Sequence, residues 1–342
     1  MTAKFRVGLT RDILDTRGEP AFGRAALGIL DREPDIEWEY LPKILLEIEA
    51  EQAARYDALY VNIARVPAAA VAHPDCRLRV VARHGVGYDT VDIAAMTQAG
   101  VIVTNTPTAM PRPVATTALT FMLALSGKLF LKDRLTRTGR WHERMDNMGR
   151  GLTGRTLGVV GAGGIGRELL RMARTFDLKL VAADPFANEI ELNYLDTRKV
   201  SLETLLRTAD FVVVCCLLNA KTYHLIGAQQ FALMRPEAYF INVARGPIVD
   251  EQALIGALQE RRIAGAALDV FEQEPVDPAN PLLTMDNVIL TPHSLCWTDE
   301  CFHNMACTGL QSIVDVLGGR VPEFVVDREV IQHPRVQASL RA

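Results

Sequence analysis

The sequence lacks the features that mark several classes of protein. Its six cysteines include no Cys-x-x-Cys pair and no zinc-like spacing with histidine, so we expect free thiols, a reducing compartment and no bound metal. No stretch is rich in lysine and arginine, and the net charge is -4, which disfavours a nucleic-acid partner. The longest apolar run, residues 114–125, is too short to cross a bilayer, and residues 1–10 lack a signal-peptide core. These absences predict a cytoplasmic protein with neither a membrane nor a nucleic acid as partner.

The composition that is present is typical of a folded protein with more than one domain. The 342 residues are 49% hydrophobic and 23% charged, and no low-complexity tract interrupts them. A chain of this length has enough apolar residues for two domains of ordinary size, each with a core of its own.

Short β-branched runs alternate with helical patterns at the start of the chain. The predicted strands lie at residues 5–9, 57–63, 79–82 and 101–104. Such alternation is typical of β–α units around a parallel sheet. Pro107, Pro111 and Pro113 then break the pattern, which predicts a domain boundary followed by a linking helix over residues 114–129.

A second alternating series supplies six more apolar strands. They are predicted at residues 157–160, 180–184, 211–214, 239–243, 266–270 and 288–290. A final helix, predicted over residues 299–317 and followed by a polar tail from residue 327, can return to the first series. We therefore predict an α/β protein with two parallel-sheet domains, of which residues 1–107 and 299–342 form one and residues 108–298 form the other, inserted domain.

A Gly-x-Gly-x-x-Gly pattern follows the first strand of the second series. Gly161, Gly163 and Gly166 separate this strand from a predicted helix at residues 167–175. In such a turn the first glycine permits the tight bend, the second lets the backbone approach a pyrophosphate, and the third lets the helix approach the strand. The amides at the positive end of the helix would hold the anion. A glycine-rich turn without a ligand is the alternative.

Asp184 ends the next predicted strand, about 20 residues farther on, where a carboxylate can accept hydrogen bonds from a ribose. Its charge would repel a ribose phosphate, and residues 185–187 (PFA) offer no arginine to receive one. These residues predict NAD rather than NADP as the cofactor of a Rossmann-like domain. The alternative is that Asp184 is only a turn residue before Pro185.

Three titratable residues follow late strands of the second series: Arg245, Glu274 and His293. Ligands of an open α/β sheet bind at the carboxyl ends of the strands, so we expect these three side chains in one site. Singly, each has a simpler explanation: a surface ion pair, a turn before Pro275, or a loop histidine after Pro292.

The chain at this point resembles the D-isomer-specific 2-hydroxyacid dehydrogenase family. The resemblance covers nearly the whole chain and includes residues 84–92 (HGVGYDTVD) and 103–107 (VTNTP), which look like signatures of the family's first domain. It implies a discontinuous, flavodoxin-like substrate domain, an inserted NAD-binding Rossmann domain and a homodimer. The implied activity is hydride transfer between the nicotinamide of NAD and the α carbon of a small D-2-hydroxy acid or 2-keto acid.

The family's catalytic arginine, glutamate and histidine fall on Arg245, Glu274 and His293. His293 would exchange a proton with the substrate oxygen, Glu274 would hold the far nitrogen of its ring, and Arg245 would orient the substrate. Arg245 and His293 are therefore also expected to bind the substrate, together with the backbone amides of Val86 and Gly87. The resemblance implies further residues along the cofactor, namely Gly164, Ile165, Cys216, Val243, Ala244 and Asp269.

Two positions depart from the family's usual pattern and bear on the substrate. His84 stands where a small or apolar residue is frequent, and it would either contact the substrate or cap the preceding strand. Trp297, within residues 294–298 (SLCWT), brings bulk after His293 and would narrow or reshape the pocket. The alternative to an enzyme is a non-catalytic NAD-sensing interaction protein of the same fold, and the presence of all three catalytic residues argues against it.

Overall fold

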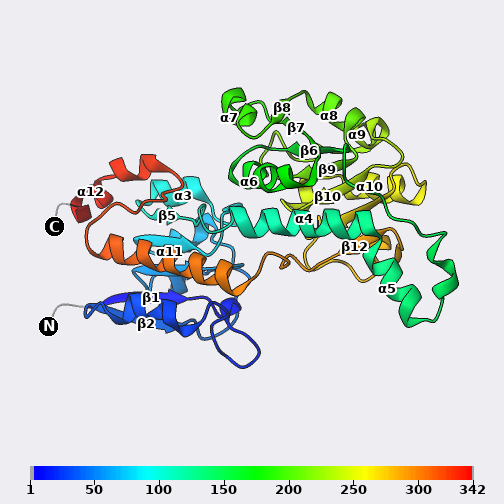
Figure 1. The fold of residues 1–342 in the computed structure, drawn as a ribbon. Helices are drawn as coiled ribbons and strands as arrows, with labels where there is room; N and C mark the ends of the chain where they lie inside the picture. The colour runs from blue at the N-terminus through cyan, green and yellow to red at the C-terminus, as the bar shows by residue number, and fades with distance from the viewer. Residues whose placement is uncertain (1–3, 341–342) are drawn as a thin grey trace. The chain divides into compact units, whose positions relative to one another are not determined.

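The chain divides into two compact units, and the computed structural model describes residues 4–340. Unit 1 comprises Met1–Met110 and Trp297–Ala342, and unit 2 comprises Pro111–Cys296; the sequence pattern placed the junctions at 107/108 and 298/299. Residues 1–3 and 341–342 of the predicted discontinuous domain lie outside the described residues. Each unit contains one fully parallel sheet with helices around it, which confirms the predicted fold class (Figure 1).

The sheet of unit 1 has the order β2-β1-β3-β4-β5. Its strands are β1 (Phe5–Leu9), β2 (Ile36–Tyr40), β3 (Ala58–Val61), β4 (Val80–Arg83) and β5 (Ile102–Thr104). β3 is buried along its whole length, which explains its uninterrupted apolar sequence. The sequence pattern does not predict β2, an edge strand in which the exposed Glu37 and Glu39 alternate with half-buried residues.

The chain returns to unit 1 through α11 (Asp299–Leu317), the returning helix that the sequence predicts. Thr298 caps its start by accepting a hydrogen bond from the amide of Cys301. The buried side of α11, including Phe302 and Leu310, shares a core with Val7 of β1 and Tyr60 of β3. The same core therefore joins the two ends of the chain.

The other helices of unit 1 are short. They are α1 (Gly28–Asp31), α2 (Ala50–Ala53), α3 (Ile93–Gln98) and α12 (Pro334–Leu340). The predicted polar tail is wrong: the segment forms η8 (Arg328–Gln332) and α12, because Val330 and Val336 are buried in the core of unit 1. The remaining 3-10 helices of the chain are η1 (Arg11–Ile13), η2 (Arg24–Leu27), η3 (Ala68–Val71), η4 (Trp141–Arg144), η5 (Arg174–Phe176), η6 (Gly246–Ile248) and η7 (Pro281–Thr284).

The sheet of unit 2 has the order β12-β11-β10-β9-β6-β7-β8. Its strands are β6 (Thr156–Val160), β7 (Lys179–Ala183), β8 (Thr197–Lys199), β9 (Phe211–Val214), β10 (Tyr239–Asn242), β11 (Gly265–Leu268) and β12 (Val288–Leu290). The sequence pattern predicts six strands for this sheet and misses β8, an edge strand of three polar residues. The strand order reverses between β6 and β9, and loops diverge at such a point and leave room for a ligand.

Helices of unit 2 cover this sheet (Figure 1). They are α4 (Pro111–Gly127), α5 (Leu129–Arg137), α6 (Gly164–Ala173), α7 (Glu189–Asn193), α8 (Leu202–Thr208), α9 (Ala228–Leu233) and α10 (Glu251–Gln259). α4 packs against α6 and is largely buried. Within residues 4–340 no single helix is long and apolar enough to span a membrane; α4 and α5 reach that length together, but the chain bends by 55° between them.

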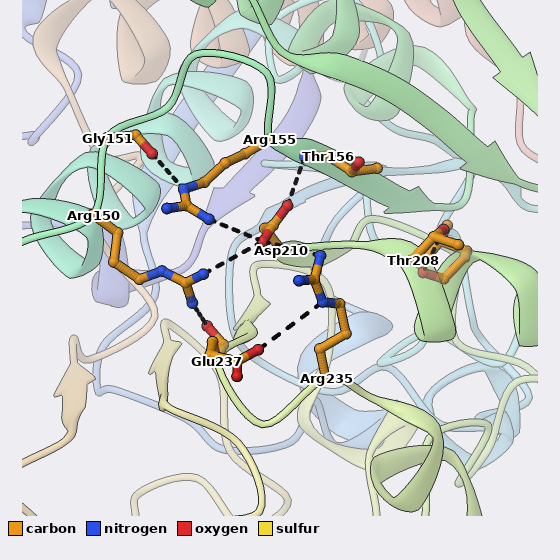
Figure 2. Close-up of polar contacts among 9 residues, drawn as sticks. Arg150, Gly151, Arg155, Thr156, Thr208, Asp210, Arg235 and Glu237 are labelled. Atoms are coloured by element: carbon orange, nitrogen blue, oxygen red, sulfur yellow. Dashed lines mark hydrogen bonds and ion pairs between the residues drawn. The ribbon is translucent and has the colours of Figure 1, made fainter.

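A buried carboxylate joins the amino ends of two strands of unit 2, β6 and β9. Asp210 directly precedes β9, and its Oδ2 accepts a hydrogen bond of 2.9 Å from the amide of Thr156 in β6. The guanidinium groups of Arg150, Arg155 and Arg235 surround its Oδ1 at 3.6, 3.3 and 3.4 Å (Figure 2). This network lies at the edge of the sheet opposite the loops described next.

Candidate active site

The predicted site residues of unit 2 gather at one edge of its sheet. All of its strands are parallel, so the loops that follow them leave from the same edge. These loops carry the glycine turn after β6, Asp184 after β7, Cys216 after β9, Arg245 after β10, Asp269 after β11 and His293 after β12.

The glycine turn contains two positions, Gly161 and Gly166, at which a side chain would not fit. Gly161 has a φ of +95°, and a Cβ there would lie 2.6 Å from the Cα of Cys216. A Cβ on Gly166 would lie 2.1 Å from the carbonyl oxygen of Gly161, so α6 could not approach β6 so closely. A Cβ on Gly163 would meet no atom within 4 Å, which leaves open space beside the start of α6. Open space next to the amides of a helix start fits a pyrophosphate.

Asp184 is tied to the glycine turn. Its Oδ2 accepts a hydrogen bond of 2.8 Å from the amide of Ala162, and its Oδ1 accepts one of 2.8 Å from the amide of Phe186. Each oxygen keeps a further lone pair, and a ribose hydroxyl could donate to it. The carboxylate is therefore held in a fixed orientation beside the glycine turn.

The other predicted cofactor residues lie at the same edge of the sheet as this turn. Gly164 and Ile165 form the first turn of α6, and Val243 and Ala244 follow β10. Cys216 packs against Gly161, and burial raises the pKa of its thiol to about 11, so it remains uncharged. An uncharged surface at this place suits a flat, neutral ring.

Arg245 sits on a turn that Asn242 shapes. The Asn242 side chain donates to the carbonyl oxygen of Arg245 at 2.9 Å, and its Oδ1 accepts from the amide of Ala244 at 3.0 Å. Gly246 follows, where a Cβ would lie 1.8 Å from the carbonyl oxygen of Phe271, so the loops after β10 and β11 touch. The sequence pattern does not identify Asn242 as a site residue, although a buried asparagine at a strand end is a usable signal.

Glu274 and His293 form a direct pair. Nδ1 of His293 lies 2.8 Å from Oε2 of Glu274, while Oε1 of Glu274 accepts a 2.9 Å hydrogen bond from the amide of Phe271. The two side chains are 37% and 39% exposed, so the pair remains accessible to a small molecule. With Nδ1 engaged, Nε2 is the ring nitrogen left for a reacting group.

Electrostatics keep the Glu274 carboxyl ionised. Partial burial acts to raise its pKa, but the hydrogen bond and charge of His293 act against it, helped by the amide of Phe271 and the charge of Arg245. The net pKa is lowered. The arginine is therefore close enough to act on the Glu274–His293 pair.

Asp269 holds the turn that presents His293. Its Oδ1 accepts hydrogen bonds from the hydroxyl of Thr291 at 2.5 Å and from the amides of Ser294 and Leu295 at 3.0 and 3.2 Å. His293 lies within this turn with a φ of +54°, a conformation that histidine adopts more readily than most residues. Asp269, predicted to line the cofactor, thus also orients the histidine.

A second histidine–glutamate pair lies in neighbouring loops of unit 2, and the sequence pattern does not point to it. Nε2 of His224 contacts Oε1 of Glu272. Oε2 of Glu272 accepts from the amide of Glu251, whose own carboxylate accepts from the amide of Glu272 at 3.0 Å. This network anchors the segment that carries Glu274, two residues farther along the chain.

Val86 and Gly87 lie in a loop of unit 1 that has hydrogen-bonded carbonyl oxygens and, among the described residues, two amides without an acceptor. The carbonyl oxygen of Gly85 accepts from the amide of Thr106 at 3.0 Å, and that of Val86 accepts from the Asn105 side chain at 2.8 Å. Within residues 4–340 the amides of Val86 and Gly87 have no hydrogen-bond acceptor. Adjacent unengaged amides can bind an anion.

His84 neither caps its strand nor lies at the surface. It is 2% exposed, its Nδ1 is hydrogen bonded to the Tyr60 hydroxyl, and its ring packs on Phe302 with centroids 4.7 Å apart. Burial and the charge of Arg83 lower its pKa to about 3, so the ring is neutral. Trp297 packs on the same Phe302 at 5.0 Å and is 43% exposed. The Trp297 ring is therefore held by a contact within unit 1.

No group of three or more histidine, cysteine, aspartate or glutamate side chains in the described part of the chain could hold a metal ion. All six cysteines are free thiols.

Comparison with known proteins identifies a family. Residues 119–294 match the D-isomer specific 2-hydroxyacid dehydrogenase, NAD binding domain. A glyoxylate reductase of Korarchaeum cryptofilum is 38% identical over 259 residues, which cover 75% of this chain and 78% of that protein.

Solved structures agree over nearly the whole chain. The structure of a glyoxylate reductase from Paecilomyes thermophila matches with a TM-score of 0.80 at 27% identity, covering 96% of this chain and 100% of that one. A D-lactate dehydrogenase from Lactobacillus jensenii, solved with NAD+, matches with a TM-score of 0.76 at 26% identity, covering 94% and 100%.

Proposed function

The chain belongs to the D-isomer-specific 2-hydroxyacid dehydrogenase family, and from this premise we propose that Arg245, Glu274 and His293 are its catalytic residues. The family's activity is NAD-dependent hydride transfer on 2-hydroxy and 2-keto acids, and it is the activity of this chain. The observation that supports the residue assignment is the 2.8 Å contact between Nδ1 of His293 and Oε2 of Glu274, with the charge of Arg245 acting on it.

NAD fits the glycine turn of unit 2. The open space at Gly163, the amides at the start of α6 and the fixed carboxylate of Asp184 are the groups that would hold its pyrophosphate and ribose. When bound, the nicotinamide supplies or accepts the hydride. We assign the remaining cofactor contacts to Gly164, Ile165, Cys216, Val243, Ala244 and Asp269.

His293 moves the proton. In the reductive direction its protonated ring donates from Nε2 to the substrate oxygen as that oxygen becomes negatively charged. In the oxidative direction the neutral ring accepts the hydroxyl proton at the same atom. Glu274, kept ionised by its lowered pKa, balances the charge of the imidazolium and fixes the ring through Nδ1.

Arg245 and the amides of Val86 and Gly87 bind the acid. The guanidinium offers a planar fork of donors that matches a carboxylate, and the two unengaged amides can take a carboxylate oxygen. On this assignment unit 1 is the substrate domain and unit 2 is the NAD-binding domain. The two junctions between the units, after Met110 and before Trp297, then separate the substrate domain from the NAD-binding domain.

Glyoxylate is the first substrate to test, because relatives that are 38% and 34% identical to the chain are named glyoxylate reductases. A screen of 2-keto acids with NADH, on the native chain and on His293→Ala, tests the proposal. We expect a kcat at least about 100-fold lower in the variant, as is typical for the loss of a general acid. Failure to turn over any 2-keto acid, or an unchanged kcat in the variant, contradicts it. Nothing in the structure or the comparisons favours the non-catalytic alternative.

A homodimer through unit 2 is also proposed. Large apolar side chains of α4, α5, η4 and the segment that follows η4 are between 43% and 69% exposed; they are Leu123, Leu129, Phe130, Trp141, Met145 and Met148. Exposed apolar groups that cluster along neighbouring elements are typical of an interface, and a second copy would cover them. Light scattering on Phe130→Glu checks this: the native chain is expected to be a dimer and the variant a monomer.

The six free thiols support a reducing compartment, for which we propose the cytoplasm.

A further inference from the structure

Two arginines face a cavity at the amino edge of the sheet of unit 1. The cavity has a volume of about 610 Å³, and its walls include Arg79, Arg335, Gly318 and Gly319. Arg79 directly precedes β4, whereas the loop of residues 84–87 follows the carboxyl end of the same strand. The cavity therefore lies at the opposite end of β4 from the proposed substrate loop.

Arg79 carries a positive charge that its surroundings do not neutralise. Among residues 4–340 its side chain has no hydrogen-bond or ion-pair partner, and its Cζ lies 5.5 Å from the centroid of the Phe5 ring. Asp57, whose charge acts on it, already accepts two hydrogen bonds from Arg77 and one from the amide of Arg6. A half-buried cation of this kind is stabilised by an added anion.

Arg335 is held in a fixed orientation beside it. Its two terminal nitrogens donate to the carbonyl oxygens of Ala99 at 3.3 Å and Cys76 at 3.2 Å, which fixes the plane of the guanidinium. Each of these nitrogens has a second hydrogen. The charge of Arg335 is close enough to lower the pKa of Arg79, alongside the larger effect of burial, although the charge of Asp57 opposes both.

We propose that this cavity binds a small oxyanion, a phosphate or a carboxylate group, between the guanidinium groups of Arg79 and Arg335. Guanidinium groups bind such anions through paired hydrogen bonds, and an anion between two of them removes their mutual repulsion. Gly318 and Gly319 leave room because they have no side chain. The site is independent of the catalytic proposal, since none of its residues takes part in it.

Inorganic phosphate is the probe for this site. Calorimetric titrations would use the full chain saturated with NADH, so that the dinucleotide site is occupied, at constant ionic strength maintained with chloride. Arg79→Gln and Arg335→Gln remove one guanidinium each, and Arg55→Gln removes an exposed arginine of unit 1 that does not line the cavity. Phosphate that binds beside Arg245 contributes equally to every variant.

We expect phosphate to bind at least tenfold more weakly to Arg79→Gln and to Arg335→Gln than to the native chain, with less than a twofold change in Arg55→Gln. Arg79→Lys, which keeps the charge and loses the fork, should lie between. Circular dichroism melting curves check that each variant is folded. Displacement of phosphate by acetate would show that carboxylates also fit, and no displacement would show a phosphate site. Equal affinity in Arg79→Gln and Arg55→Gln, or no saturable binding to the native chain, overturns the proposal.

Discussion

Asp57 and Asp210 occupy equivalent positions in the two units: each directly precedes an inner strand, and each accepts a hydrogen bond from the amide near the start of the neighbouring strand. The acceptors are Oδ2 of Asp57 for the amide of Arg6 at 2.7 Å and Oδ2 of Asp210 for the amide of Thr156 at 2.9 Å. Asp57 is neutralised by Arg77, whereas Asp210 has three arginines (Figure 2). The same arrangement therefore fastens the amino edge of both parallel sheets.

Asp210→Asn is expected to destabilise the protein by about 2–4 kcal/mol, because it leaves three guanidinium groups without their buried counter-ion. The Asp210 side chain is only 6% exposed, so solvent screens it little. Urea unfolding followed by circular dichroism measures the loss. Glu203→Gln, at a glutamate whose side chain is 65% exposed, is the control and should change the unfolding midpoint little. Equal midpoints for the two variants would show that the network does not contribute to stability.

The buried His84 is expected to make unit 1 sensitive to acid. Its pKa is about 3 in the folded chain and near 6.5 when unfolded, so only the unfolded chain takes up a proton between these values. The free energy of unfolding should therefore fall as the pH drops below 6.5, by on the order of 2 kcal/mol at pH 5.

The double variant His84→Phe, Tyr60→Phe tests this, because it removes the histidine without leaving the Tyr60 hydroxyl unpaired. Its free energy of unfolding should change less between pH 6.5 and pH 4 than that of the native chain. His142→Gln, at a histidine whose side chain is 81% exposed, should keep the native slope. If the free energy of unfolding of the double variant changes with pH as much as that of the native chain, His84 is not the group that titrates.

Glu274→Gln is expected to lower kcat about 100-fold and to leave KM for the acid within a few-fold, because the amide keeps a hydrogen bond to His293 but not the charge that balances the imidazolium. The pKa of Glu274 is lowered in the folded chain, so the carboxylate stabilises the native chain at neutral pH. That stabilisation is lost as the pH falls through the folded pKa. Steady-state kinetics measure kcat and KM, and urea unfolding at several pH values measures the stability, with Gln273→Asn in the same loop as control. An unchanged kcat in Glu274→Gln would remove Glu274 from the mechanism.

The sequence pattern predicted the inner strands of both sheets but not β2 and β8. Inner strands of a parallel sheet are buried on both sides and therefore appear as apolar runs. β2 and β8 are edge strands in which charged residues, Glu37 and Glu39 in β2 and Arg198 in β8, interrupt the apolar pattern. The other two edge strands, β5 and β12, are largely apolar, and the sequence pattern predicts them. The sequence pattern predicts a polar tail at the end of the chain for a related reason, since Val330 and Val336 are the only buried side chains among residues 327–340.

Residues of the candidate site were predictable where they follow a strand directly. The glycine turn, Asp184 and His293 are visible because their type and their distance from a strand carry the signal. The sequence does not reveal the contacts that orient these residues. Thr291 contacts Asp269 and Tyr60 contacts His84 across 22 and 24 residues of sequence, and only the folded sheets bring these pairs together.

Asp184→Ser is expected to shift cofactor preference from NADH toward NADPH. It removes the acceptor of the ribose hydroxyls and the charge that would repel a ribose phosphate, so the ratio of kcat/KM for NADH to that for NADPH should fall about 10- to 100-fold. Asp184→Asn keeps an oxygen for the amide of Ala162 and separates a folding defect from a specificity change. A ratio equal to that of the native chain in Asp184→Ser would show that the carboxylate does not select the cofactor.

Alanine at Gly163 is expected to impair NADH binding, whereas alanine at Gly166 is expected to impair folding. Gly163 has a φ of -70° and free space around a Cβ, so Gly163→Ala should change the free energy of unfolding by less than about 0.5 kcal/mol. Its methyl group would occupy the approach of the pyrophosphate and raise KM for NADH more than tenfold.

Gly166→Ala should instead fail in folding, because its Cβ would lie 2.1 Å from the carbonyl oxygen of Gly161 and force α6 away from β6. We expect a loss of about 3 kcal/mol or more, or an insoluble chain. Gly256→Ala within α10, where a Cβ meets nothing within 4 Å, is the matched control and should stabilise the helix slightly. Thermal unfolding and NADH titration of all three variants decide the matter. Tight NADH binding by Gly163→Ala would mean that the dinucleotide does not approach the turn at this glycine.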